Sequence, residues 1–214
     1  MENKENTKLT ETARPAANGA VEAKRADDTP KKDSGEYTLL YWVRDIVILI
    51  PIVVIVVVLI KLFMFGTYEI PSGSMIDTIE IGDRVISEKV TYLSRDPQPG
   101  EIITFADPNM PGRTLIKRVI ATEGQTVDLQ DGKVVIDGKA LDEEYTDGKP
   151  SYPLDKTSVT ITYPFTVPDD CLWVMGDNRT ESADSRYFGA VPVNTVSGHA
   201  VFTYWPIDRI GQLH

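Results

Sequence analysis

The sequence has little cysteine and histidine. Cys171 is the only cysteine in 214 residues, so no disulfide can form within the chain. It lies in the apolar run Cys171–Met175, and we expect it to be a packing residue rather than a reactive thiol. The two histidines, His199 and His214, belong to no zinc-type cysteine and histidine pattern. We therefore expect no metal and no cofactor.

Clustered positive charge is also missing. The formal net charge is -10, and the whole excess of acidic residues lies in 67–214, because residues 1–66 carry nine basic and nine acidic side chains. Nucleic-acid binding requires a concentrated basic face. The sequence therefore predicts no nucleic-acid partner.

The N-terminal part divides into a polar tail and one long apolar run. Residues 1–36 are rich in Lys, Glu, Asp, Ala, Thr and Pro, which predicts a disordered tail ending near residue 38. From Ile46 to Phe65, twenty residues are interrupted only by Pro51 and Lys61, enough for about 30 Å of helix, one bilayer core. We expect a transmembrane helix within 39–66. The alternative, a cleaved secretory signal, would need a leading region of about 45 residues, which is too long.

Basic residues near the span indicate its orientation. Within about twenty residues after the span, only Arg84 is basic. The basic residues before it are Lys24, Arg25, Lys31, Lys32 and Arg44. The positive-inside rule then predicts a single-pass protein of the cell membrane, in contact with lipid, with a cytoplasmic N-terminus and an extracytoplasmic domain at 67–214.

The region 67–214 predicts a mainly β fold, an antiparallel sheet or barrel-like domain. Asp131-Gly132 between two β-branched runs is a hairpin signal, and few windows hold a helical period. The runs expected to form strands are Arg84–Glu88, Glu101–Phe105, Leu115–Ala121, Thr126–Leu129, Lys133–Ile136, Ser158–Tyr163, Cys171–Met175 and His199–Trp205.

Ser74 and Lys117 are the candidate nucleophile and base. Ser74 follows Phe65 by only nine residues, which span at most about 30 Å, so it must act near the lipid surface. A serine nucleophile needs a neighbouring base, and neither histidine is well placed. Lys117 lies in a strand where it and Arg118 face opposite sides. Burial there would lower the pKa of Lys117 toward neutrality, whereas a lysine on an exposed face would have no such role.

Two segments supply further candidate residues that would assist this pair. In Pro71-Ser72-Gly73-Ser74-Met75, a rigid turn would leave the Ser74 N–H free as an oxyanion donor, with the Ser72 hydroxyl as a second donor. In the charged block 176–186, a mutual ion-pair network would stiffen a loop from which the Ser182 hydroxyl orients the lysine amine. The charged members of that network are Asp177, Arg179, Asp184 and Arg186. The alternative for 71–75 is a polar linker next to the membrane, and the alternative for 176–186 is a solvated surface loop.

These blocks follow one membrane-spanning helix in this order. The arrangement resembles the type I signal peptidases in their short single-span bacterial form. The matching segments are 71–75, 82–85, 117–120 and 176–186, within a resemblance covering about residues 40–207. The resemblance implies a serine endopeptidase that cleaves signal-peptide-bearing preproteins after Ala-X-Ala-like sites by a Ser/Lys dyad. It assigns Ser74 as the nucleophile and Lys117 as the general base. Ser72 would assist the oxyanion hole, and Ser182 would orient the amine of Lys117. Met75, Asp177, Arg179, Asp184 and Arg186 would support the site.

One position departs from the family pattern, and other classes of function stay open. Asp77 stands where the family usually has proline three residues after the nucleophile, which puts the substrate preference in doubt. A specialised or non-proteolytic, membrane-anchored binding or assembly protein for surface proteins is the main alternative. Self-cleaving regulatory Ser/Lys proteases also resemble this core, but they are soluble and carry a DNA-binding domain. Oligomeric state is left open.

Overall fold

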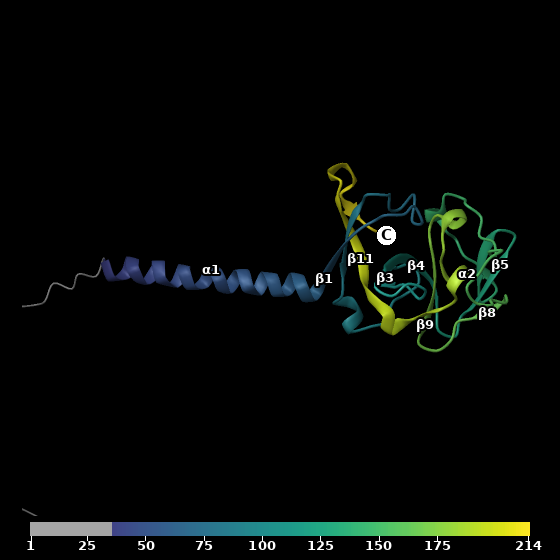
Figure 1. Ribbon diagram of the computed structural model, residues 1–214, viewed down its shortest axis with the longest axis horizontal. Coiled ribbons are helices and arrows are strands. Elements are labelled where there is room, and N and C mark those ends of the chain that lie inside the picture. The colour runs from purple at the N-terminus through teal and green to yellow at the C-terminus, as the bar shows by residue number, and fades with distance from the viewer. Residues whose placement is uncertain (1–35) are drawn as a thin grey trace, which may run out of the picture. The chain divides into compact units, whose positions relative to one another are not determined.

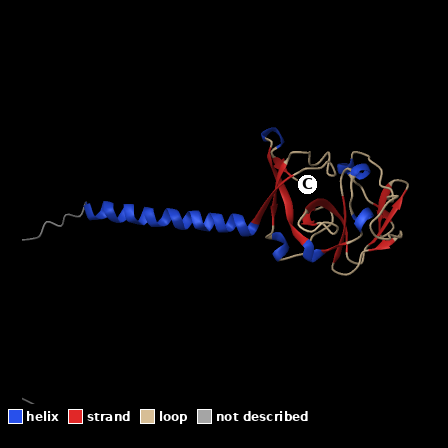
Figure 2. Ribbon diagram, in the orientation of Figure 1, coloured by secondary structure: helices blue, strands red, loops and turns tan. Residues whose placement is uncertain are grey.

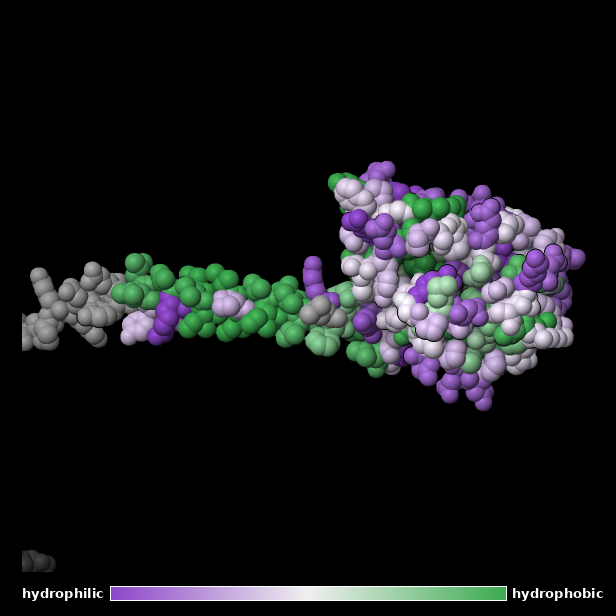
Figure 3. All heavy atoms as spheres, viewed as in Figure 1, coloured by the Kyte–Doolittle hydropathy of each residue, from purple (hydrophilic) through white to green (hydrophobic). Residues whose placement is uncertain are grey.

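The computed structural model describes residues 36–214. A single long helix, α1, covers Glu36–Met64, and its segment Thr38–Lys61 is long and apolar enough to cross a membrane. On the face seen in Figure 3 most of its side chains are hydrophobic, as expected where lipid rather than protein surrounds a helix. The predicted tail lies outside the described residues, except for its last three positions, which are helical.

The helix ends earlier than the sequence predicts. The predicted span extends to residue 66, but Phe65 and Gly66 already belong to strand β1 (Phe65–Glu69). This strand pairs with β2 (Arg84–Glu88) from Phe65 opposite Glu88 to Glu69 opposite Arg84. The hydrogen bonds of a strand ladder replace those of the helix at this point, and an apolar run alone does not distinguish the two.

The region beyond the helix is built mainly of antiparallel strands, as predicted (Figure 2). Its larger sheet has the strand order β1-β2-β11-β3-β4-β9-β10, with β12 paired to β11 (Figure 1). The bounds of its remaining strands are β3 Ile102–Ala106, β4 Thr114–Thr122, β9 Cys171–Met175, β10 Val191–Pro192, β11 Val196–Trp205 and β12 Gly211–Gln212.

A smaller sheet has the order β7-β6-β5-β8. Its strands are β5 Thr126–Gln130, β6 Lys133–Ile136, β7 Lys139–Ala140 and β8 Phe165–Thr166. The predicted hairpin is confirmed: Asp131 and Gly132 connect β5 to β6 with φ of 51° and 76°. Two positive φ angles are what a tight two-residue hairpin turn requires.

Short helices complete the fold. One is α-helical, α2 (Ser185–Phe188). The others are 3₁₀ turns at Thr91–Leu93, Glu144–Thr146, Arg179–Glu181, Val193–Thr195 and Ile207–Arg209.

One predicted strand is wrong. The segment Ser158–Tyr163 forms no strand; instead the backbone N–H and the hydroxyl of Ser158 both donate to the carbonyl of Tyr187. Ile161 and Tyr163 pack on the apolar cluster around Trp173. The alternating apolar residues of this segment therefore serve packing, and no strand pairs with its backbone.

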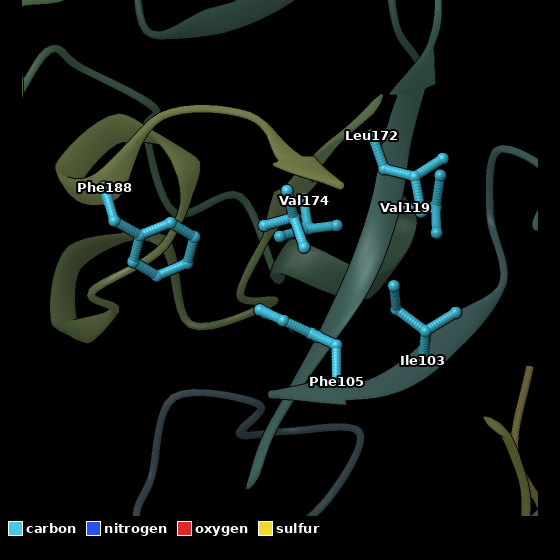
Figure 4. Close-up of a cluster of buried hydrophobic side chains, with 7 residues drawn as sticks. Ile103, Phe105, Val119, Leu172, Val174 and Phe188 are labelled. Carbon is cyan, nitrogen blue, oxygen red and sulfur yellow. The ribbon is translucent and has the colours of Figure 1, made fainter. Parts of the chain in front are cut away.

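The core next to β4 keeps that strand in place. Ile103, Phe105 and Val119 from β3 and β4 pack with Val174 of β9 and with Phe188 of α2 (Figure 4). All five are at most 7 % exposed. Such close packing leaves the backbone of β4 little freedom, so side chains that project from it have well-defined positions.

Candidate active site

The structure brings the two candidate catalytic residues together. The Nζ atom of Lys117 lies 2.6 Å from Oγ of Ser74, across 43 residues of sequence, and 2.8 Å from the carbonyl oxygen of Ile116. Ser74 and Lys117 are 8 % and 3 % exposed. A buried hydroxyl within hydrogen-bond distance of a buried amine is the arrangement required for a nucleophile and its base.

The two adjacent cations of strand β4 contact different partners. Lys117, opposite Ile103 of β3, reaches Ser74. Arg118, opposite Met175 of β9, forms a two-bond ion pair with Asp177, at 2.9 and 2.6 Å. Both side chains are buried, which excludes the exposed-face alternative for this strand.

Burial sets the protonation of Lys117. Loss of hydration lowers the pKa of its amine from 10.5 to about 8, while Asp184 and Asp177 raise the pKa and oppose this effect only in part. A pKa near 8 gives a substantial neutral fraction close to physiological pH. Lys117 can therefore accept a proton there, which an ordinary lysine cannot.

Apolar anchors hold the loop that carries Ser74. Met75 and Ile79 are fully buried and pack in a cluster with Ile70 and Val85. Because Met75 points into this core, the chain direction at Ser74 is fixed next to it. Ser72, the predicted second oxyanion donor, is exposed and lines the same pocket as Ser74.

The charged block 176–186 is mostly buried and ion-paired, but its ion pairs differ in part from the prediction. Asp184 does pair with Arg186 at 2.9 Å. Asp177 pairs outside the block with Arg118 and also accepts a hydrogen bond of 2.5 Å from the hydroxyl of Thr78.

Arg179 also finds its ion-pair partner outside the block, although its Nε donates to the carbonyl oxygen of Gly176 within the block at 3.0 Å. It pairs with Glu143 at 2.5 Å and donates to the hydroxyl of Ser151 at 2.6 Å. The ring of Tyr145 lies 4.0 Å from the Arg118 guanidinium. Four of these site residues were missed in the sequence: Thr78, Arg118, Glu143 and Tyr145. The two adjacent cations of β4 were the only sequence signal, because a partner that is distant in sequence leaves no local pattern.

Ser182 lies near the pair without a hydrogen bond to it. Its buried Oγ atom has no hydrogen-bond partner within residues 36–214, whereas Lys117 contacts Ser74 and the carbonyl of Ile116. Its predicted role in orienting the amine therefore stays a prediction.

Gly176 is a point of close approach that admits no side chain. A Cβ atom there would lie 2.3 Å from Oγ of Ser182 and 2.4 Å from the carbonyl oxygen of Ser74. We expect Gly176→Ala to displace the Ser74 backbone, to reduce peptide cleavage at least about tenfold and to destabilise the fold by about 1–3 kcal/mol. Cleavage kinetics and thermal unfolding would measure this. Gly211→Ala is the control, because a Cβ there meets nothing within 4 Å and the backbone φ is not positive. Wild-type activity in Gly176→Ala would contradict the expectation.

A pocket of about 220 Å³ opens over the pair. Its apolar lining includes Leu115, Ala183 and Phe188, and its charged lining includes Arg113 and Glu181. The other lining residues are Ser72, Ser74, Asp107, Asn109, Lys117 and Tyr187. Apart from the serines and Lys117, none of these was named as a site residue from the sequence. They come from the β3–β4 hairpin, from α2 and, for Glu181 and Ala183, from the block 176–186. Among residues 36–214, no group of three or more His, Cys, Asp or Glu side chains is arranged to hold a metal.

The chain is similar to known signal peptidases. A probable signal peptidase I-1 of Synechocystis sp. is 38 % identical, over 80 % of this chain and 87 % of the relative. A signal peptidase I of Leptolyngbya laminosa is 38 % identical, over 72 % of this chain and 75 % of the relative. A crystal structure of a signal peptidase I from Enterococcus faecalis V583 is 35 % identical and covers 49 % of this chain and 97 % of its own, with a TM-score of 0.41. The family described as signal peptidase, peptidase S26, matches residues 42–205, and this chain belongs to that family.

Proposed function

We propose that this serine endopeptidase removes signal peptides from exported preproteins, cutting after Ala-X-Ala-like sites with Ser74 and Lys117. The observation that carries the proposal is the 2.6 Å contact between a buried amine and a buried hydroxyl at a pocket. Family membership supports the same reaction class.

The reaction follows from the protonation of Lys117. The neutral amine takes the proton of the Ser74 hydroxyl as Oγ attacks the carbonyl carbon of the scissile peptide bond. The carbonyl oxygen becomes an oxyanion, which the backbone N–H of Ser74 and the hydroxyl of Ser72 stabilise. The Lys117 ammonium then protonates the leaving amine, and the C–N bond breaks to leave an ester on Ser74. Water, deprotonated by Lys117, hydrolyses that ester and restores both side chains.

The pocket supports a preference for small residues before the cut. Leu115, Ala183 and Phe188 form apolar lining beside Ser74, and the whole pocket measures about 220 Å³. This volume must hold several atoms of backbone as well as side chains. We therefore expect alanine at the residue before the cut, because a larger side chain there would compete with the substrate backbone for the same space.

The proposed setting is the cell membrane, with α1 as the anchor. We place the cytoplasmic tail at 1–38, the transmembrane helix at 39–66 and the peptidase domain outside at 67–214, on the distribution of basic residues around the span. Preproteins whose apolar signal segment is embedded in the same bilayer would then reach Ser74 at a raised effective concentration.

The test uses the full chain in lipid vesicles and a preprotein with an Ala-X-Ala site. We expect cleavage at the single peptide bond after the second alanine, identified by mass spectrometry of both products. Phenylalanine at the residue before the cut should abolish cleavage, whereas phenylalanine at the middle position should not. If several such preproteins remain intact, the proposal fails, and a non-proteolytic binding role gains support.

A further inference from the structure

We infer that Asn178 is a positioning residue whose side-chain amide orients the backbone N–H of Ser74 toward the oxyanion. The inference rests on the proposed function, because it assigns a task within that reaction. Asn178 lies in the buried turn after β9 and is 6 % exposed. Its neighbours on either side, Asp177 and Arg179, are held by buried ion pairs, so the backbone at Asn178 has little freedom.

Asn178 holds the backbone on both sides of the nucleophile. Its side-chain Nδ2 donates to the carbonyl oxygen of Gly73 at 2.9 Å. Its backbone N–H donates to the carbonyl oxygen of Ser74 at 3.1 Å. Two peptide units that flank one Cα atom are therefore tied to the same residue, which restricts both backbone dihedrals of Ser74.

The planar peptide bond converts the first contact into an orientation of the donor. The Gly73 carbonyl and the Ser74 N–H belong to one peptide unit, and in a trans unit they point in opposite directions. Fixing the carbonyl toward Asn178 therefore turns the N–H away from Asn178. That N–H donates no hydrogen bond to any residue in 36–214, so it is free to donate to the oxyanion.

The side-chain amide itself has one orientation that satisfies its neighbours. The Oδ1 atom of Asn178 lies 3.4 Å from the hydroxyl of Thr180, which donates to it. The Nδ2 end is then the end that meets Gly73. The Gly73 carbonyl also accepts a longer bond of 3.3 Å from the N–H of Ile76, so loss of Asn178 would loosen the peptide unit without releasing it completely.

Asn178→Ala and Asn178→Asp test the inference. Neither replacement can donate to Gly73, because alanine has no polar group and an ionised aspartate only accepts. Loss of a complete oxyanion donor lowers kcat by about 10²–10³, and a loosened donor should cost less, so we expect kcat to fall about ten- to a hundredfold. KM should change little, because the donor acts on the transition state.

A peptide aldehyde gives a readout that does not depend on turnover. Its tetrahedral adduct with Ser74 places an oxygen at the oxyanion position, so its affinity should fall by the same factor as kcat. Affinity for an uncleavable peptide with proline after the cut should stay at the wild-type value. Asn194→Ala makes the same change at an exposed position and should alter none of these quantities.

Each outcome decides between roles. Unchanged kcat and unchanged aldehyde affinity in Asn178→Ala would overturn the inference while leaving the proposed function intact. Equal losses for the aldehyde and the uncleavable peptide, or a lowered unfolding temperature that accounts for the loss, would also overturn it, because they indicate a structural role. If wild type cleaves nothing, the proposed function fails, and the aldehyde comparison still tests Asn178.

Discussion

Lys117→Met should abolish cleavage while leaving the protein folded. Methionine keeps most of the length and the apolar stem of lysine. It has no amine to take the proton of Ser74, whose Oγ lies 2.6 Å from the Lys117 amine in wild type. Loss of one member of a nucleophile and base pair disables both, and we expect kcat/KM to fall by at least about 10³-fold. Steady-state cleavage of an Ala-X-Ala peptide measures this. Lys139→Met, at an exposed position on β7, should cleave as wild type.

The pH profile of wild type tests the protonation state directly. Because burial lowers the pKa of Lys117 to about 8, about one tenth of the amine is neutral at pH 7 and about nine tenths at pH 9. Cleavage should therefore rise about tenfold between these values and then level off. A rise that continues toward pH 10.5, or active Lys117→Arg protein, would mean that the base lies elsewhere.

The same pKa shift predicts a gain in stability on losing the base. The unfolded chain holds the Lys117 proton up to a pKa of 10.5, whereas the folded chain releases it above about 8. Between these values the unfolded state binds more protons, so wild-type stability rises with pH. Below pH 8 burial of the charged amine costs about 3 kcal/mol, from about 1.4 kcal/mol per pKa unit. We expect Lys117→Met to unfold at a higher temperature than wild type at pH 7. The difference in unfolding temperature should shrink as the pH rises toward 10.5.

Ser74→Ala should also remove cleavage, for a different reason. The variant keeps the base, the pocket and the backbone N–H of residue 74 but has no oxygen to attack the peptide carbonyl. We expect kcat to fall by at least about 10³-fold, while the affinity for an uncleavable signal peptide stays near the wild-type value. The measurements are cleavage and peptide binding on the same preparation.

Two other serine replacements serve for comparison with the loss of kcat in Ser74→Ala. Ser94→Ala, at an exposed position that does not line the pocket, should have no effect. Ser72→Ala should lose about 10²-fold in kcat if its hydroxyl is the second oxyanion donor. Substantial turnover by Ser74→Ala would contradict its assignment as nucleophile.

The sequence was sufficient for the features that depend on local patterns. The apolar run predicted α1, the alternating β-branched runs predicted seven of the eight proposed strands to within a few residues, and Asp131-Gly132 predicted the β5–β6 turn. These features follow from hydrophobic periodicity and backbone preference, which neighbouring residues determine. Ser158–Tyr163 shows the limit, because its alternation serves packing against Trp173 and not pairing in a sheet.

Only the tertiary structure decided the chemistry of the site. The sequence contained Ser74 and Lys117, but their 2.6 Å contact depends on the β4 register and on the core that anchors Met75. The pKa of Lys117 depends on how much water the fold removes from it. The partners of Asp177 and Arg179 lie 59 and 36 residues away in sequence. Such long-range contacts leave no local trace in a sequence, because they arise when distant strands pack into one core.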